Sequence, residues 1–119
     1  MTAISSAALD SAADLFRGLA HPVRLRILLA LEGGALSPSE LAPLLAVQLG
    51  LVSYQVHALR DDGLLELVDT RAVRGSVQSF YRLTPRGEWA RLLLAAMLSE
   101  QSDLETQAVR LVGRSPTAP

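Results

Sequence analysis

The sequence predicts a mainly α-helical fold with one small β-hairpin, and three observations in its middle part support this prediction. A capped stretch at 37–45 has the apolar spacing of a short helix and is followed by a tight turn. A second helical stretch at about 48–62 ends at Gly63. Two strand-like runs then flank a turn at 71–76 that is rich in arginine and glycine. Helix, turn, helix and wing is the order of a winged helix-turn-helix, here with about five helices and a two-stranded wing.

Length and composition place the chain among small globular proteins. At 119 residues, of which 50% are hydrophobic, it is predicted to form one domain over 1–113 with a flexible tail at 114–119. It contains no cysteine, which excludes disulfides, thiolate metal sites and thiol-based redox sensing. The N-terminus lacks the features of a signal peptide, and the longest wholly apolar run, 92–98, is far shorter than a membrane span. We therefore expect a cytoplasmic protein with no membrane partner.

The distribution of charge matters more for a nucleic-acid partner than the net charge of −1. All 11 cations are arginine, and four of them lie between 71 and 86, where the sequence has no acidic residue. Because salt screens each charge beyond about 8–10 Å, a basic wing can attract DNA although the whole chain is slightly acidic. The net charge predicts modest nonspecific affinity. The alternative is a wing of solvated arginines without a partner.

Two helices are expected before the helix-turn-helix. The first, at about 7–19, has an apolar face made by Leu9, Phe16 and Leu19. His21-Pro22 opens the second, because proline is tolerated in the first turn of a helix. Gly33-Gly34 ends it. Arg24 and Arg26 are expected to project away from its buried stripe, which consists of Val23, Ile27, Leu28 and Leu31.

The start of the third helix is the clearest local signal in the chain. Ser37-Pro38-Ser39-Glu40 places serine at the N-cap, proline at N1 and glutamate at N3, which is the arrangement of a capping box. Pro43 falls well inside the helix, where proline cannot donate a backbone hydrogen bond. The helix is therefore expected to be short and slightly irregular.

The fourth helix is predicted to be the one that reads DNA. At 100° per residue, its core side is confined to about 80° and consists of Leu49, Val52, Val56 and Leu59. The opposite side presents Gly50, Tyr54, His57 and Asp61, with Ser53 at the boundary. Small residues allow close approach to a groove, and hydroxyl or imidazole groups can bond base edges. The alternative is an ordinary amphipathic helix whose polar face meets water.

The hairpin and the last helix complete the prediction. Runs at 64–69 and 77–83 read as strands, with the tip at Arg74-Gly75-Ser76. Thr84-Pro85 begins a helix that continues to about Val112. Between 89 and 98 this helix is apolar almost all round, so more than one face must be covered. We expect a second copy to cover it, through Leu9, Phe16, Trp89, Leu92, Leu93, Ala96 and Met97. The alternative is a buried central helix in a monomer.

The chain resembles the ArsR family of winged-helix repressors over about residues 15–98. The resemblance lies in the ordered set Leu19-Ala-His-Pro-Val-Arg-Leu-Arg-Ile-Leu28, Ser37-Pro-Ser-Glu-Leu-Ala42, Val52-Ser-Tyr-Gln-Val-His-Ala-Leu-Arg-Asp-Asp-Gly-Leu-Leu65, Arg74-Gly-Ser and Tyr81-Arg-Leu83. It implies a homodimer, joined through the first and last helices, that binds a partly palindromic operator in double-stranded DNA. The DNA-binding positions that it implies are Gln48, Gly50, Ser53, Tyr54 and His57 on the helix, Arg60 near its end, and Arg74 on the wing. Leu49 is left out because the helical geometry turns it inward.

Departures from the family concern metal sensing. Many members bind metals through cysteines near the recognition helix or through histidine and carboxylate pairs on the last helix. This chain has no cysteine and its histidines are His21 and His57. Glu100, Asp103 and Glu105 on the last helix have no nitrogen ligand beside them and read as a solvated face, and His21 reads as a helix-start residue. We expect no metal site and no cofactor.

The leading interpretation is therefore a sequence-specific DNA-binding regulator, a homodimeric repressor. A small apolar molecule between the 89–98 helix and its surroundings is a candidate effector. The alternative is a winged-helix module that binds protein and not DNA, favoured by the net acidity and by Leu51 beside the outward face. The sequence has no catalytic triad, glycine-rich phosphate loop or metal-ligand spacing, so an enzyme is not expected.

Overall fold

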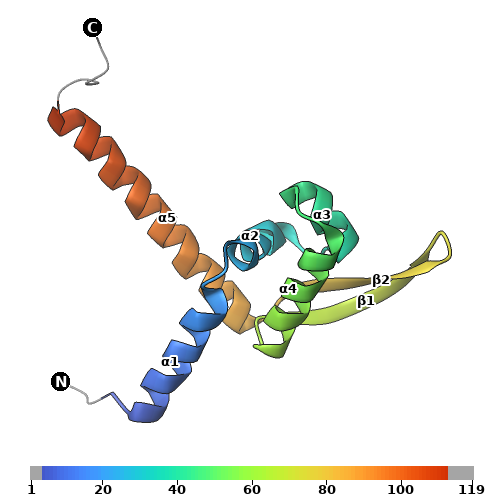
Figure 1. The fold of residues 1–119 in the computed structure, drawn as a ribbon. Helices are drawn as coiled ribbons and strands as arrows, with labels where there is room; N and C mark the ends of the chain where they lie inside the picture. Colours follow the sequence, from blue (N-terminus) through green and yellow to red (C-terminus); the bar gives the residue numbers. More distant parts are fainter. Residues whose placement is uncertain (1–3, 113–119) are drawn as a thin grey trace, which may run out of the picture.

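The computed structural model describes residues 4–112 and contains five α-helices, one short 3₁₀ turn and one β-hairpin (Figure 1). This confirms the predicted mainly helical fold with a two-stranded wing. In chain order the elements are α1 (Ser6–Leu19), α2 (Pro22–Ala30), η1 (Leu31–Gly33), α3 (Pro38–Leu45), α4 (Leu49–Asp61), β1 (Leu65–Val73), β2 (Ser76–Leu83) and α5 (Pro85–Val112).

Local capping signals place the helix starts where the sequence predicts them. The side chain of Ser37 accepts from Glu40 N while the Glu40 carboxylate accepts from Ser37 N, which completes the capping box of α3. His21 caps α2, its Nδ1 accepting from Val23 N at 3.2 Å, which confirms its role as a helix-start residue. Thr84 Oγ1 accepts from Gly87 N at the start of α5. Pro43 lies inside α3, which is only eight residues long.

The core lies where α2, α3 and α4 meet the base of the hairpin and the first turns of α5. The expected stripe of α2 and the inward side of α4 are confirmed, apart from Leu49 (discussed below). The fully buried large side chains are Ile27, Leu28, Leu41, Val52, Val56, Leu59, Leu64 and Leu65. No single helix among the described residues is long and apolar enough to cross a membrane, although α3 and α4, bent by 118°, satisfy the length and composition of a span as a pair.

The wing is an antiparallel hairpin whose turn is narrower than predicted. β1 continues to Val73 and β2 begins at Ser76, so the turn consists of Arg74 and Gly75 alone. Both have positive φ angles, 51° and 82°, which is the backbone of the two-residue turn that matches the twist of paired strands. The expected six-residue loop at 71–76 is therefore wrong. A further pairing, between Leu36 and Tyr81, adds a short third segment beside β2.

Two arms extend from the core, α1 and the second half of α5 (Figure 1). The radius of gyration is 18.4 Å, whereas a compact domain of this length has about 13.5 Å. On α1 only Leu15 is buried, and the predicted packing residues Leu9 and Phe16 are both 56% exposed. Trp89 and Leu92 on α5 are 55% and 53% exposed, so a buried central helix within a monomer is wrong.

Candidate nucleic-acid interface

The bend between α3 and α4 presents one side of α4 outside the core. The two helices are bent by 118° across a turn in which Ala46 adopts the left-handed conformation (φ 55°). Ala46 N and Val47 N donate to the carbonyls of Pro43 and Ala42, so the turn satisfies the last carbonyls of α3. The angle between the helices is therefore fixed by backbone hydrogen bonds as well as by the core.

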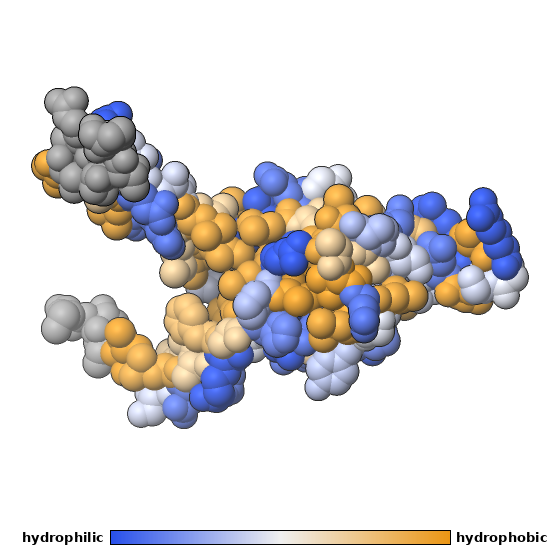
Figure 2. All heavy atoms as spheres, turned by 45° about the horizontal axis from the view of Figure 1, so that its top comes forward, coloured by the Kyte–Doolittle hydropathy of each residue, from blue (hydrophilic) through white to orange (hydrophobic). Residues whose placement is uncertain are grey.

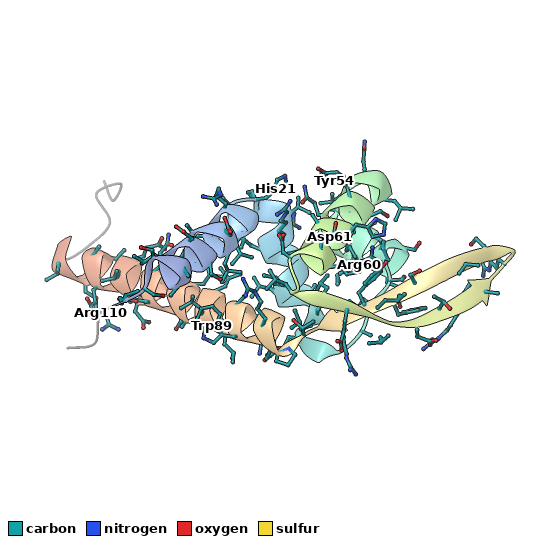
Figure 3. All side chains as sticks on the ribbon, turned by 90° about the horizontal axis from the view of Figure 1, so that it is seen from below. His21, Tyr54, Arg60, Asp61, Trp89 and Arg110 are labelled. Atoms are coloured by element: carbon teal, nitrogen blue, oxygen red, sulfur yellow. The ribbon has the colours of Figure 1, made fainter. Side chains whose placement is uncertain are left out.

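The outward side of α4 carries most of the predicted contact residues. Tyr54 is 68% exposed on the open side of the helix (Figure 3), and His57 is exposed to solvent as well. A Cβ added to Gly50 would meet no heavy atom within 4 Å. Gln48 is the N-cap residue, and its side chain makes no cap hydrogen bond, so its amide is available to a partner. Ser53 is half-buried, as its boundary position predicts.

Two positions of α4 differ from the helical projection. Leu49 is 48% exposed and not part of the core, which corrects its predicted inward position. As the first residue of α4, it lines a groove between α3, α4 and β2 instead of packing in the core. Gln55 takes a buried position instead and is 3% exposed. The projection places Gln55 next to Leu59, so the signal for its burial was present in the sequence.

A polar groove of about 260 Å³ lies between the start of α3, the outward side of α4 and β2. It unites the predicted residues Ser53 and His57 with Ser39, Gln78 and Ser79, which the sequence analysis missed. Hydroxyl and amide groups of this kind bond phosphates and base edges. The complete lining is Ser37, Pro38, Ser39, Leu49, Ser53, His57, Val77, Gln78, Ser79 and Tyr81.

Hydrogen bonds hold the wing against α3 at the floor of this groove. Ser37 is fully buried, and its Oγ donates to Gln78 Oε1 at 3.2 Å. Leu36 and Tyr81 exchange backbone hydrogen bonds of 3.0 and 3.1 Å. The ring of His57 meets the ring of Tyr81 edge to face, with centroids 6.2 Å apart. These contacts hold α3, α4 and β2 together around the groove.

The arginines of the wing are less available than the sequence suggested. Arg71 pairs with Asp69 at 2.8 Å and covers the ring of Phe80 at 4.4 Å, and Arg82 pairs with Glu66 at 2.5 Å. The strand register sets Glu66 of β1 opposite Arg82 of β2, whereas Asp69 and Arg71 lie two positions apart on β1 itself. Three arginines and two acids lie on the hairpin, whose net charge is thus +1. Within residues 4–112 the tip residue Arg74 takes part in no ion pair.

The remaining predicted residues lie apart from the groove. Arg60 is in the last turn of α4, half-exposed and 4.0 Å from Asp61 (Figure 3). Arg74 is in the turn at the tip of the hairpin. Glu100, Asp103 and Glu105 are exposed on α5, and the described part of the chain has no group of three His, Cys, Asp or Glu side chains placed to hold a metal ion.

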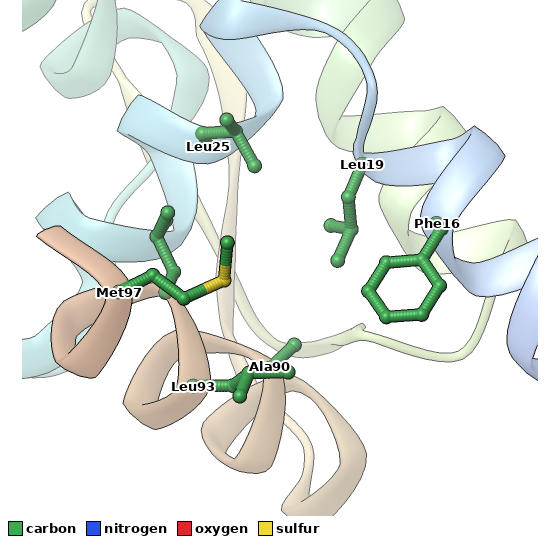
Figure 4. A pocket seen from close by; sticks show the side chains of 7 residues that line it. Phe16, Leu19, Leu25, Ala90, Leu93 and Met97 are labelled. Carbon is green, nitrogen blue, oxygen red and sulfur yellow. The ribbon is translucent and has the colours of Figure 1, made fainter. Parts of the chain in front are cut away.

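The arms carry a second candidate surface, made of apolar side chains. Hydrophobic residues line both arms in Figure 2, and Trp89 points away from the core in Figure 3. Leu9, Phe16, Trp89, Leu92, Ala96 and Met97 are exposed and Leu93 is half-buried. Between α1, α2 and α5 lies a cavity of about 160 Å³ (Figure 4), lined by Phe16, Leu19, Leu25, Ala90, Leu93, Leu94 and Met97.

Comparisons with known proteins agree with this geometry. A family described as "Helix-turn-helix domain" matches residues 19–68. The "Biofilm growth-associated repressor" of Xylella fastidiosa is 37% identical over 75 residues, which cover 63% of this chain and 61% of that protein. The match thus spans less than two thirds of that curated relative.

Solved structures cover a larger share of the chain. The crystal structure of the transcriptional repressor BigR from Xylella fastidiosa has a TM-score of 0.64 and 30% identity, over 78% of this chain and 88% of that one. The homodimeric winged helix-turn-helix DNA-binding domain Mb0332 from Mycobacterium bovis, a possible ArsR-family regulator, has a TM-score of 0.62 and 25% identity, over 85% and 92%. The chain belongs to the ArsR family of winged helix-turn-helix transcriptional regulators.

Proposed function

We propose that this chain is a sequence-specific DNA-binding repressor that acts as a homodimer on a palindromic operator. The observation that carries the proposal is the open outward side of α4, with Gly50 and Tyr54 unobstructed next to the polar groove that α3, α4 and β2 share. A helix presented in this way can enter the major groove, where base edges are distinguishable. Its relatives named as repressors support the direction of regulation.

The proposed contacts divide into two kinds. Gln48, Gly50, Ser53, Tyr54 and His57 face base edges, because they lie on the outward side of α4 or at its start. Arg60 and Arg74 contact the phosphate backbone. A guanidinium at the end of the helix or at the tip of the wing interacts with the phosphate charge, which is the same for every base sequence. With a net charge of +1 on the hairpin, nonspecific affinity is expected to be modest.

The arms form the proposed dimer interface through Leu9, Phe16, Trp89, Leu92, Leu93, Ala96 and Met97. Their exposure in the protomer leaves a large apolar surface that a second copy removes from water. The homodimeric Mb0332 domain supports this assembly. A two-fold dimer would read a site of two symmetric half-sites.

The cavity between α1, α2 and α5 is the proposed effector site, and its occupant is an apolar ring of about the size of benzene. An apolar engineered cavity of about 150 Å³ binds benzene, and this one has about 160 Å³. Benzene or indole is therefore expected to lower operator affinity. Leu94→Phe, which fills the cavity, should abolish that response, and Leu98→Phe, on an exposed residue outside the lining, should keep it. A response unchanged by Leu94→Phe would exclude this cavity as the effector site.

The test of the DNA assignment is a binding titration by fluorescence anisotropy across a salt series. The probes are the DNA upstream of the protein's own gene, duplexes that the wild type selects from a random pool, and an unrelated duplex. Arg74→Ala should weaken binding to all of them and reduce the salt slope by about 1. Tyr54→Ala should weaken binding mainly to the selected duplex, by about 1–3 kcal/mol.

A matched control separates these effects from general damage. Arg17 is exposed and pairs with Asp14 on the same arm helix, so Arg17→Ala should leave both affinities unchanged. If neither the Arg74 nor the Tyr54 variant alters DNA binding, the repressor assignment fails. Equal, feeble binding of the wild type to all duplexes would favour the protein-interaction module, for which the exposed Leu51 is the supporting feature.

A further inference from the structure

Arg24, on α2, makes hydrogen bonds to both α1 and α4. Its Nε donates to Gln55 Oε1 on α4 at 2.6 Å, and its Nη1 donates to the carbonyl of Gly18 on α1 at 2.6 Å. The same Nη1 lies 3.6 Å from Asp62 Oδ2, at the end of α4. The side chain is only 18% exposed, because Arg24 projects away from the buried stripe of α2, as expected, but towards α1 and α4 and not into solvent.

These contacts need a side chain with several N–H donors and a positive charge, which a guanidinium provides. Gln55 is 3% exposed on the buried side of α4, so its amide oxygen depends on a protein donor. The Gly18 carbonyl belongs to the last turn of α1, where carbonyls lack helical partners and positive charge is favourable. The fork of N–H groups in arginine serves both acceptors at once, which the single ammonium of lysine does less well.

At Gly18 the end of α1 lies close to the end of α4. A Cβ at position 18 would lie 2.8 Å from Asp62 Oδ2 and 3.6 Å from Arg24 Nη1. Leu15 is the only buried residue of α1, so this arm has little other attachment to the core. The position of α4 relative to the arm therefore depends on the Arg24 hydrogen bonds.

We propose that Arg24 is a positioning residue that fixes the angle between α1 and α4, and so the half-site spacing that the dimer reads. The inference rests on the proposed function, in which α1 belongs to the dimer interface and α4 to the DNA interface. In a two-fold dimer that reads DNA with helices, the distance between half-sites is set by the distance between the two recognition helices. Loosening the link between arm and recognition helix relaxes that distance without removing a DNA contact.

The experiment measures affinity against spacing. The selected operator is prepared with its natural spacing, with one or two base pairs inserted between the half-sites, and as a single half-site. Wild type should lose at least about tenfold in affinity on the two-base-pair insertion. Arg24→Gln should lose less than about threefold, while keeping wild-type affinity for the single half-site and the mass of a dimer. Arg17→Gln makes the same change of charge on an exposed residue of α1 and should keep the wild-type profile.

The outcomes separate this inference from the proposed function. If affinity falls with added spacing as steeply in Arg24→Gln as in wild type, the proposed role of Arg24 is wrong and the proposed function is unaffected. The same conclusion holds if Arg24→Gln also loses affinity for the single half-site, since that loss would indicate general damage to α4. Wild type that shows no selective binding at all overturns the proposed function, and this inference with it. If circular dichroism shows that Arg24→Gln does not fold, Arg24→Lys, which retains the charge, replaces it. A smaller loss of affinity with added spacing in Arg24→Lys than in wild type would support the role of Arg24, and an equal loss would overturn it.

Discussion

Two glycines in helices have opposite surroundings. Gly87, in the first turn of α5, packs directly on the backbone at the base of the wing, and a Cβ there would lie 2.0 Å from the Leu64 carbonyl oxygen and 3.0 Å from its carbon. Thr84 reinforces the same junction, since its N donates to the Leu64 carbonyl and its Oγ1 to that of Gly63. Gly50, in the first turn of α4, faces open space. The first glycine therefore serves the fold, and we assign the second to function.

Gly87→Ala should destabilise the protein. The clash is with backbone atoms, which cannot move aside as a flexible side chain would, so α5 must shift from β1. We expect the free energy of unfolding to fall by about 1–3 kcal/mol or more. Urea denaturation followed by circular dichroism measures it. A stability equal to that of wild type would mean that α5 begins elsewhere.

Gly50→Ala should have the reverse effect. Nothing obstructs the added methyl group, and alanine is favoured over glycine in a helix by about 1 kcal/mol, so stability should stay equal or rise. Affinity for the selected operator should nevertheless fall, because the methyl group projects from the side of α4 proposed to enter the major groove. Anisotropy titration checks this. Undiminished affinity in a folded protein would remove the first turn of α4 from the DNA interface.

At the level of elements, Arg91 attaches α5 to the end of α2. It is 8% exposed, pairs with Glu88 one turn earlier and lies 3.4 Å from Glu32 in η1. The hydrogen bond from Arg91 lowers the pKa of Glu88 below its ordinary value, and the same bond raises the pKa of Arg91. A buried, paired arginine thus lies within the 89–98 stretch that reads as apolar all round in the sequence.

The stability contributed by this pair should depend on pH. Because the folded-state pKa of Glu88 is lower than its unfolded value of about 4.3, the contribution is fully present above that value and is lost as pH falls through the folded-state pKa. Wild type should be more stable than Glu88→Gln at pH 7, and the two should converge at low pH. Urea denaturation between pH 7 and pH 3 measures the difference. Glu100→Gln, at an exposed position on the same helix, is the control, and a difference independent of pH would contradict the assignment.

The predictability of each element follows from the range of the interactions that define it. The starts of α2, α3 and α5 are predictable because their capping residues lie within three positions of the helix. The width of the wing turn, and the pairing of Arg82 with Glu66, depend on the register between strands. The hydrogen bond from Ser37 to Gln78 joins residues 41 positions apart, and no local sequence pattern indicates it. Of the candidate site, the outward side of α4 was therefore predictable, and the groove formed with β2 was not.

For the whole molecule, shape and exposed surface both require a partner. The two arms raise the radius of gyration well above that of a compact domain, and they expose large apolar side chains such as Phe16, Leu92 and Met97. A single chain cannot cover these residues, because its core lies elsewhere. The apolar run at 89–98 predicts that a second surface covers α5, and the protomer alone does not provide that surface.

Leu92→Glu should therefore convert the dimer into a monomer. The residue is 53% exposed in the protomer, so the substitution leaves the core intact, but in the proposed interface it buries a charge in an apolar contact. Sedimentation velocity should show the mass of one chain, with unchanged circular dichroism. Affinity for the full operator should fall on the order of a hundredfold or more, towards that for a single half-site, because the second recognition helix is no longer tethered. Leu44→Glu, a matched change at an exposed leucine of α3, should remain a dimer. If Leu92→Glu stays dimeric, the chains join through another surface, and the two α4 helices would then have to meet the operator in a different relative orientation.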